Sequence, residues 1–396
     1  MELTKDALMP LIERAYDRAV SIRNDLHMHP ELSEEEVRTS QVIADTLRAL
    51  GIETRENIAG HGVIGTIYGR DRTRAVGIRA DIDALPITEE LASPICSLNP
   101  GVMHACGHDM HTAILLGTAM VLNEIRDELP LSVRLIFQPA EETTGGALPM
   151  IQEGILNDIQ VDRVIGLHVE PRHETGVVEF IPGVMNAAIT DFDITVNGKS
   201  CHGAHPDKGI DPIPCACDMV LSYQTILTRR LDPASGALIT TGSFHSGTAN
   251  NVISDKAELI GTIRTLETED MELIKREFPA MIDSIAKAYG CTADIKLRDS
   301  YPNLKCDTDL LDILIKTCEG LLGKEKVVIN PVSSLGGDDF SYFCHHARGC
   351  YYNLGCHRPG DEKVYSLHSS VFDPDEKCML TGILTEVMSA IELMNN

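Results

Sequence analysis

Short apolar runs alternate with helical segments in the first part of the chain, and this alternation limits the fold more than any other feature. Residues 63–67, 75–80, 131–137 and 164–167 predict strands, and residues 109–125 predict a helix with a largely apolar body. A capping box formed by Ser33 and Glu36 predicts the start of another helix, which Gly51 ends. Strands that alternate with helices favour an α/β domain with a mostly parallel sheet.

Polar side chains gather where these strands are expected to end. Asp81 and Asp83 follow one strand, Glu141 and Glu142 follow another, and His168 ends a third. In open α/β sheets, ligands bind at the carboxyl ends of the strands. Polar clusters at three strand ends therefore predict one functional site at this edge of the sheet.

A different pattern begins near residue 187. Residues 190–196 alternate with period two, residues 257–263 do so more loosely, and the stretches 213–228 and 270–289 predict helices. With a further strand at 293–297, the order β-α-β-β-α-β is typical of a ferredoxin-like α+β unit. We therefore expect a catalytic domain made of residues 1–186 and 300–396, with residues 187–299 inserted into it as a second domain.

The charge balance limits what the protein can bind. The 396 residues include 34 basic and 59 acidic side chains, which gives a formal net charge of −25 at pH 7. This charge disfavours nucleic acids and anionic membranes as partners. The N-terminus lacks the basic and apolar segments of a secretory signal, and the apolar run 113–122 is too short to span a bilayer. We expect a cytoplasmic protein whose 12 cysteines are reduced thiols.

Three histidines, a cysteine and an aspartate lie within residues 103–111. Cys106 and His108 have a spacing that suits ligands on a loop, and thiolate with imidazole favours Zn, Mn, Co or Ni over Mg or Ca. A reduced core cysteine beside a surface histidine is the alternative for this pair taken alone.

Glu141 and Glu142 are adjacent, so on a turning backbone their carboxylates point in different directions. One can bind a metal while the other faces the substrate, which is the division that metal-assisted hydrolysis needs. A solvated helix start after Pro139 is the alternative. Asp81 and Asp83 can orient a ligand imidazole, or they can form a polar loop after the strand.

These residues resemble the amidohydrolase branch of the aminoacylase-type two-metal peptidases. That branch includes hippurate hydrolases, indole-acetyl-amino-acid hydrolases, and deacetylases of N-acetyl amino acids or N-acetyl-diaminopimelate. The resemblance runs nearly end to end, and the segments that carry it are Leu26–Glu31, Arg79–Pro86, His104–His111, Phe137–Glu142, Gly198–His202, Asp211–Pro212, Asn251–Ile253, Gly261–Arg264 and Asp338–Phe340.

The resemblance implies a role for individual residues. It implies that Glu141 is the general acid/base and that Asp83 supports the metal site. In the inserted domain, it implies that His202 reaches the active site of the partner subunit in a homodimer, and that Asn251 and Arg264 hold a substrate carboxylate. The implied ligands of two divalent metal ions (Zn, Mn, Co or Ni) are Cys106, His108, Glu142, His168 and His368.

The chain departs from the family pattern at three positions. Asp338, Asp207 and Ser370 stand where the family usually has glutamate, histidine and proline. None of the three removes an implied metal ligand, so these departures concern the specificity for the acyl group.

The sequence therefore predicts a metal-dependent amidohydrolase that cleaves an N-acyl amino acid into a carboxylic acid and a free amino acid. Water activated by the metals attacks the amide carbonyl, and Glu141 passes the proton from this water to the leaving nitrogen. Two alternatives remain: a dipeptidase or aminopeptidase on the same scaffold, and a non-catalytic relative that binds acyl-amino acids or metal.

Overall fold

The computed structural model describes residues 3–396, which form two compact units. The first unit extends to Gly183 and also contains Lys305–Val332 and Asp339–Asn396. The second unit contains Val184–Leu304 and Ser333–Asp338. In chain order, the second unit is thus an insertion into the first.

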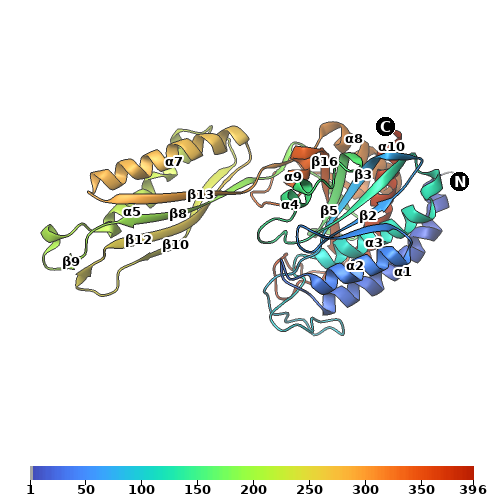
Figure 1. Ribbon diagram of the computed structural model, residues 1–396, viewed down its shortest axis with the longest axis horizontal. Helices are drawn as coiled ribbons and strands as arrows, with labels where there is room; N and C mark the ends of the chain where they lie inside the picture. Colours follow the sequence, from blue (N-terminus) through green and yellow to red (C-terminus); the bar gives the residue numbers. More distant parts are fainter. Residues whose placement is uncertain (1–2) are drawn as a thin grey trace. The chain divides into compact units, whose positions relative to one another are not determined.

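The first unit is built on an eight-stranded sheet in the order β1-β2-β4-β3-β5-β16-β6-β15 (Figure 1). The central neighbours β4, β3, β5 and β16 are parallel, and β1 and β2 add an antiparallel edge. This sheet confirms the predicted α/β class. Its strands are β1 (Glu53–Ile58), β2 (Gly62–Ile67), β3 (Asp71–Asp81), β4 (Leu131–Gln138), β5 (Gln160–Glu174), β6 (Val178–Phe180), β15 (Val327–Ile329) and β16 (Arg348–His357).

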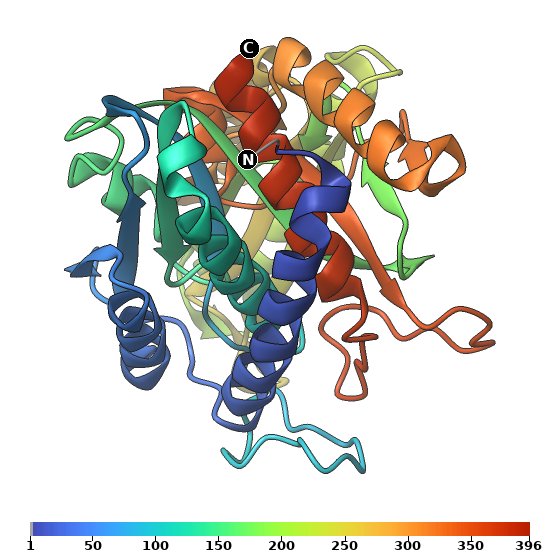
Figure 2. The ribbon, with the colours of Figure 1, turned by 90° about the vertical axis from the view of Figure 1, so that its right-hand side faces the viewer.

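Three long helices, α1 (Lys5–Met28), α3 (His108–Glu124) and α10 (Cys378–Asn395), pack together on one face of this sheet (Figure 2). Helix α3 is buried from residue 108 to residue 122 because it lies between the sheet and the other two helices. Gly117 permits the close approach of α3 to α10, since a Cβ atom there would lie 2.5 Å from Ile383 Cδ1.

The shorter helices of the first unit complete its surface. None of the described helices, long or short, is both long and apolar enough to cross a membrane. The shorter ones are α2 (Val37–Ala49), α4 (Ala147–Gln152), α8 (Thr308–Leu322) and α9 (Ser341–His346), with the 3-10 turns η1 (Arg126–Glu128) and η3 (Lys324–Lys326).

The second unit has a four-stranded antiparallel sheet in the order β10-β12-β8-β13. Helices pack on this sheet around an aromatic core, in which the ring of Phe278 lies 5.0 Å from the rings of both Phe192 and Tyr223. The elements are β8 (Ala188–Asn197), α5 (Pro212–Ser222), α6 (Gln224–Arg229), β10 (Ala237–Ser246), β12 (Lys256–Thr265), α7 (Thr268–Ala288) and β13 (Thr292–Tyr301). Their order is that of a ferredoxin-like unit.

Short elements complete the second unit. A two-stranded ribbon pairs β9 (Cys201–His202) with β11 (Val252–Ile253), and the 3-10 turn η2 (Pro206–Lys208) follows β9. Strand β7 (Val184–Asn186) pairs with β14 (Leu304–Lys305). Residues 333–338 join this unit through backbone hydrogen bonds, such as that from Ala187 N–H to the Gly336 carbonyl at 3.0 Å.

Three local predictions are wrong. Helix α2 begins at Val37 without a side-chain cap, because the Ser33 hydroxyl instead donates to Asp83 Oδ2 at 2.7 Å. His168 lies inside β5 and does not end it, because β16 pairs with β5 as far as Glu174. The helix predicted at 213–228 is interrupted at Tyr223, whose side chain is buried in the core.

Candidate metal centre

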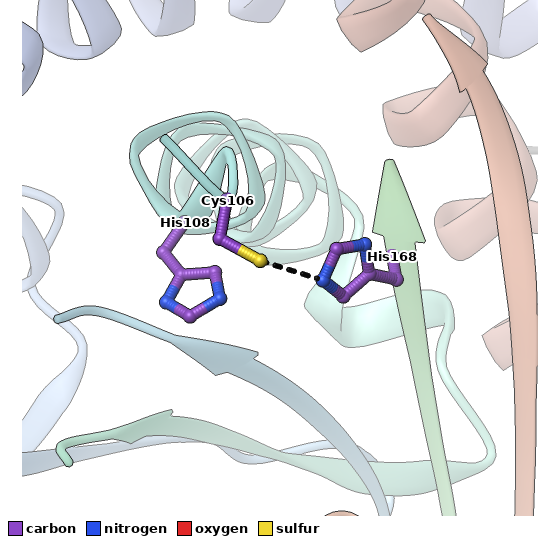
Figure 3. Close-up of side chains that lie close together, drawn as sticks. All are labelled: Cys106, His108 and His168. Carbon is purple, nitrogen blue, oxygen red and sulfur yellow. Dashed lines mark hydrogen bonds between the residues drawn. The ribbon is translucent and has the colours of Figure 1, made fainter. Parts of the chain in front are cut away.

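Cys106 and His108 lie beside β5 because the residue between them is a glycine. Gly107 adopts a φ of +85°, and a Cβ atom there would lie 2.4 Å from Val169 Cγ2 on β5. The loop before α3 can therefore approach the strand closely. Figure 3 shows Cys106 and His108 at the start of α3, with the Cys106 sulfur directed toward His168 on β5.

The five residues predicted to bind metal come together in the first unit. Cys106 Sγ lies 3.4 Å from His168 Nε2 and 3.3 Å from His368 Nε2. Glu142 Oε1 lies 3.2 Å from His368 Nε2 and 3.9 Å from His108 Nε2. A tetrahedral zinc with ordinary bond lengths would separate its sulfur and nitrogen ligands by about 3.5 Å. The separations seen here fit this spacing.

Hydrogen bonds orient the rings of the buried His108 and the half-buried His168 so that Nε2 faces the cluster. His108 Nδ1 lies 3.0 Å from the Asp83 carbonyl oxygen and 3.1 Å from Asp83 Oδ1, and His168 Nδ1 donates to the Val169 carbonyl at 2.7 Å. His108 Nε2 is buried without a hydrogen-bond partner. A buried nitrogen without a partner destabilises the fold, and a divalent metal would satisfy it.

The motif's third histidine, His111, is excluded as a ligand by its own hydrogen bonds. Its Nδ1 lies 2.6 Å from Asp81 Oδ1, and its Nε2 accepts from the Val169 N–H at 2.9 Å. Burial lowers the pKa of His111 to about 4, so the ring is neutral near pH 7. Both ring nitrogens are engaged, and His111 therefore joins α3 to β5.

A buried arginine holds Asp81 in place. Arg79 Nη1 donates to Asp81 Oδ2 at 2.5 Å, Nη2 donates to Asp339 Oδ1 at 2.7 Å, and Nε donates to Gln138 Oε1 at 2.8 Å. Asp339 also accepts from the Ala147 N–H at 3.0 Å. These buried charges are therefore paired and hydrogen-bonded. No sequence pattern indicated this role of Arg79, because no local spacing connects residues 79 and 339.

Glu141 lies on the turn that follows β4. Its side chain is 8% exposed, and one of its oxygens lies within 4.8 Å of both the His108 and the Glu142 ligand atoms. Residues 141–144 form a turn, so the alternative of a helix start after Pro139 is wrong. A second carboxylate thus stands beside the ligand cluster.

Burial and charge act in opposite directions on the ionisable groups of the cluster. Burial would raise the pKa of Glu142, but the hydrogen bond with His368 lowers it below its usual value. Burial raises the pKa of the Cys106 thiol well above its usual range. A bound cation would reverse that shift, because metal coordination deprotonates a thiol.

The three candidate residues of the second unit, His202, Asn251 and Arg264, do not form one cluster. His202 is exposed on β9, and the Asn251 carbonyl accepts from the Gly203 N–H at 2.7 Å, so His202 and Asn251 are neighbours. Arg264 lies at the C-terminal end of β12, and its Nη1 donates to the Leu335 carbonyl at 2.8 Å.

Two of the departures from the family pattern lie near the surface. The Ser370 hydroxyl donates to Glu90 Oε2 at 2.7 Å, and its carbonyl accepts from the Glu90 N–H at 2.8 Å. A proline could not make the hydroxyl contact. Asp207 is exposed on η2.

A cluster of cysteine, histidine and carboxylate side chains beside the sheet, with a further carboxylate next to it, is the arrangement expected of a metal-dependent hydrolase. The profile of peptidase family M20/M25/M40 matches residues 77–390, and the chain belongs to this family.

The sequences of several relatives are similar to this chain over nearly its whole length. N-acetyl-L-cysteine deacetylase of Bacillus subtilis is 37% identical over 95% of this chain and 88% of its own length. Thermostable carboxypeptidase 1 of Saccharolobus solfataricus is 37% identical over 96% of each chain. A solved Bacillus subtilis structure, described as a dinuclear metal-binding peptidase of the M20 family, superposes with a TM-score of 0.83 at 32% identity, over 97% of this chain and 99% of its own. The family and the candidate ligand cluster together identify the protein as a metal-dependent hydrolase of amide bonds.

Proposed function

We propose that the protein hydrolyses N-acyl amino acids to a carboxylic acid and a free amino acid. The observation that carries this proposal is Glu141, a carboxylate beside five converging ligand side chains. The names of the relatives support the substrate class. A deacetylase removes an acetyl group and a carboxypeptidase removes a C-terminal residue, but both cleave the same type of bond. In each case the amide nitrogen belongs to an amino acid with a free carboxylate.

In this proposal the chain's own residues divide the work. Cys106, His108, Glu142, His168 and His368 would hold the two metal ions. Such ions polarise a carbonyl oxygen and lower the pKa of water. Glu141 accepts the proton of the attacking water and then delivers it to the leaving nitrogen. Asp83 keeps His108 in the tautomer whose Nε2 is free, through the contact at 3.1 Å.

His202, Asn251 and Arg264 would complete the site, with His202 as a donor to the oxyanion. Within one copy, Arg264 lies far from His202 and Asn251, which are neighbours. Lys256 and Arg264 lie eight positions apart on β12, which is about 26 Å at the usual rise of a strand. His202 and Asn251 lie beyond the Lys256 end, on the β9–β11 ribbon. One small substrate therefore cannot reach all three in a single copy, which favours a shared site in a homodimer.

The surface of the second unit supports a homodimer formed through residues 187–299. Ile213, Cys217 and Leu221 are exposed at intervals of four along α5, and Leu221 is 73% exposed. Side chains at this interval lie on one side of a helix. Strand β10 also forms an edge of its sheet, with backbone groups available for pairing.

We also place the protein in the cytoplasm. All 12 cysteines are free in the structure, as expected for a chain in a reducing compartment.

The test is Glu141→Gln together with a substrate panel. Glutamine keeps the size of the side chain but cannot accept the proton, so turnover should fall at least ~100-fold with metal content unchanged. N-acetyl amino acids, other N-acyl amino acids and dipeptides should be assayed by product analysis after loading with Zn, Mn, Co or Ni. Near-normal turnover by the variant would remove Glu141 from the mechanism, and activity restricted to dipeptides would favour the dipeptidase alternative.

A further inference from the structure

The residue before Glu141 has an unusual backbone conformation. Ala140 has a φ of +55°, in the left-handed region that strains any residue other than glycine. Its two backbone groups are both engaged. The N–H donates to Glu36 Oε1 at 2.8 Å, and the carbonyl accepts from the Gly145 N–H at 2.9 Å. The strained conformation is therefore held from outside the turn.

The amide on the other side of Glu141 is held in the same way. The Glu142 N–H donates to Asp83 Oδ2 at 3.0 Å. Two carboxylates from distant parts of the chain thus fix the amides of residues 140 and 142, and Glu141 lies between them. Asp83 already serves the metal centre through His108, whereas Glu36 contacts the turn through a backbone amide.

The burial of Glu36 destabilises the fold, which suggests that its contact with the Ala140 N–H serves a function. The residue is fully buried at 0% exposure, and its Oε2 has no hydrogen-bond partner. A buried polar oxygen without a partner destabilises a folded protein. Burial raises the pKa of Glu36 to about 7, so the side chain is partly neutral at neutral pH. An apolar residue of similar size would avoid this cost but could not hold the Ala140 amide.

We propose that Glu36 is a positioning residue for Glu141: its carboxyl group holds the Ala140 N–H, and this contact aims the Glu141 side chain at the reacting water. The inference rests on the proposed role of Glu141 and extends it to a residue that lies 104 positions before Ala140 in the chain. Misplacing a catalytic group by about 1 Å can lower the rate about 100-fold. Loss of this one hydrogen bond should therefore lower turnover without touching the metal ligands.

Two substitutions of nearly equal length separate the hydrogen bond from the space that the side chain fills. Glu36→Gln keeps an acceptor oxygen, and Glu36→Met fills the same space without one. We expect Glu36→Met to lower kcat about 10- to 100-fold, with KM and metal content close to those of the wild type. Glu36→Gln should retain most of the activity. Glu34→Met is the matched control, because Glu34 is exposed and accepts from Thr144 Oγ1 at the far end of the same loop.

A double-mutant cycle tests whether Glu36 acts through Ala140. Glycine adopts a positive φ without strain, so the kcat loss caused by Glu36→Met should be smaller in the Ala140→Gly background. Wild-type kcat in Glu36→Met, or equal losses in the Met and Gln variants, would overturn the proposal. A Glu36→Met protein that does not fold, or that loses its metals, would make Glu36 a structural residue and also overturn it. Activity of Glu141→Gln, measured separately, would instead overturn the proposed function.

Discussion

The two units present their candidate functional residues in opposite environments. In the first unit, His108 is 0% exposed and Glu141 is 8% exposed, and Asp83 and Arg79 hold the groups around them. In the second unit, His202 and Asn251 are exposed on a short ribbon. Preorganised groups act most strongly when the surrounding structure fixes them. The first unit therefore holds its candidate ligands in a fixed arrangement, whereas the candidate residues on the ribbon of the second unit are open to solvent.

Removal of a central ligand should give the largest effect and tests whether the metal centre belongs to the first unit alone. Cys106 Sγ contacts both His168 and His368, so Cys106→Ala should lose bound metal and activity together, to the level of the chelator-treated protein. Metal content by elemental analysis and turnover are the measurements.

Cys215→Ala is the matched control for this prediction. Cys215 is also buried but lies in the core of the second unit. Its removal should lower stability while the metals stay bound. Retention of two metals by Cys106→Ala would contradict the role of Cys106 as a ligand, and full activity of the metal-free wild type would contradict a metal-dependent mechanism.

The next effect should come from His202 and would show whether the exposed region contributes to catalysis. Loss of one oxyanion donor costs about 100- to 1000-fold in kcat. His202→Ala should therefore lose turnover on that scale while it keeps its metals, because His202 lies outside the unit that contains the ligand cluster. Steady-state kinetics and metal analysis together check this.

Complementation then tests the shared site. A mixture of His202→Ala and Glu141→Gln proteins should recover part of the activity, because a heterodimer would contain one site with both residues intact. Size-exclusion chromatography must show a dimer, and exchange between differently tagged subunits must be demonstrated. No recovery despite exchange would place His202 in the site of its own subunit or outside the chemistry.

Sequence patterns predicted the α/β class and the ferredoxin-like order, because these depend on local periodicity and turn residues. Periodicity is less informative where tertiary contacts decide an element's length. Strand β5 continues past His168 because β16 lies beside it, and the interruption at Tyr223 follows from the packing of that ring in the core. Neither contact is visible in a local pattern.

The candidate ligands could be found from the sequence because cysteine, histidine and acidic residues are chemically distinctive. The residues that support them could not. Arg79 reaches Asp339, Ser33 reaches Asp83, and Glu36 reaches Ala140, and each contact joins segments with no common pattern. Ser33 and Glu36 also match a capping box, and that local interpretation obscured their tertiary contacts.

The last effect concerns stability instead of activity and contrasts a buried acid of the first unit with an exposed one of the second. Glu386 is buried in α10, where the Thr118 hydroxyl donates to its Oε2 at 2.8 Å. Burial raises the pKa of Glu386 to about 8. In the unfolded chain it should titrate near 4.3. The folded pKa is higher, so the stabilising contribution is complete below about pH 4 and is lost as the pH rises through about 8.

Glu386→Gln should remove this dependence, because glutamine carries no charge at any pH and can still accept from Thr118. In the wild type, each pH unit between about 5 and 8 lowers the free energy of unfolding by up to about 1.4 kcal/mol through this one group. The gap between the denaturation curves of variant and wild type should therefore widen from pH 5 to pH 9 at constant metal content. Glu272→Gln, on the exposed side of α7, should give no such divergence. Curves for Glu386→Gln that stay parallel to those of the wild type would show that Glu386 is hydrated, and that the first unit protects its acids less than the buried contacts indicate.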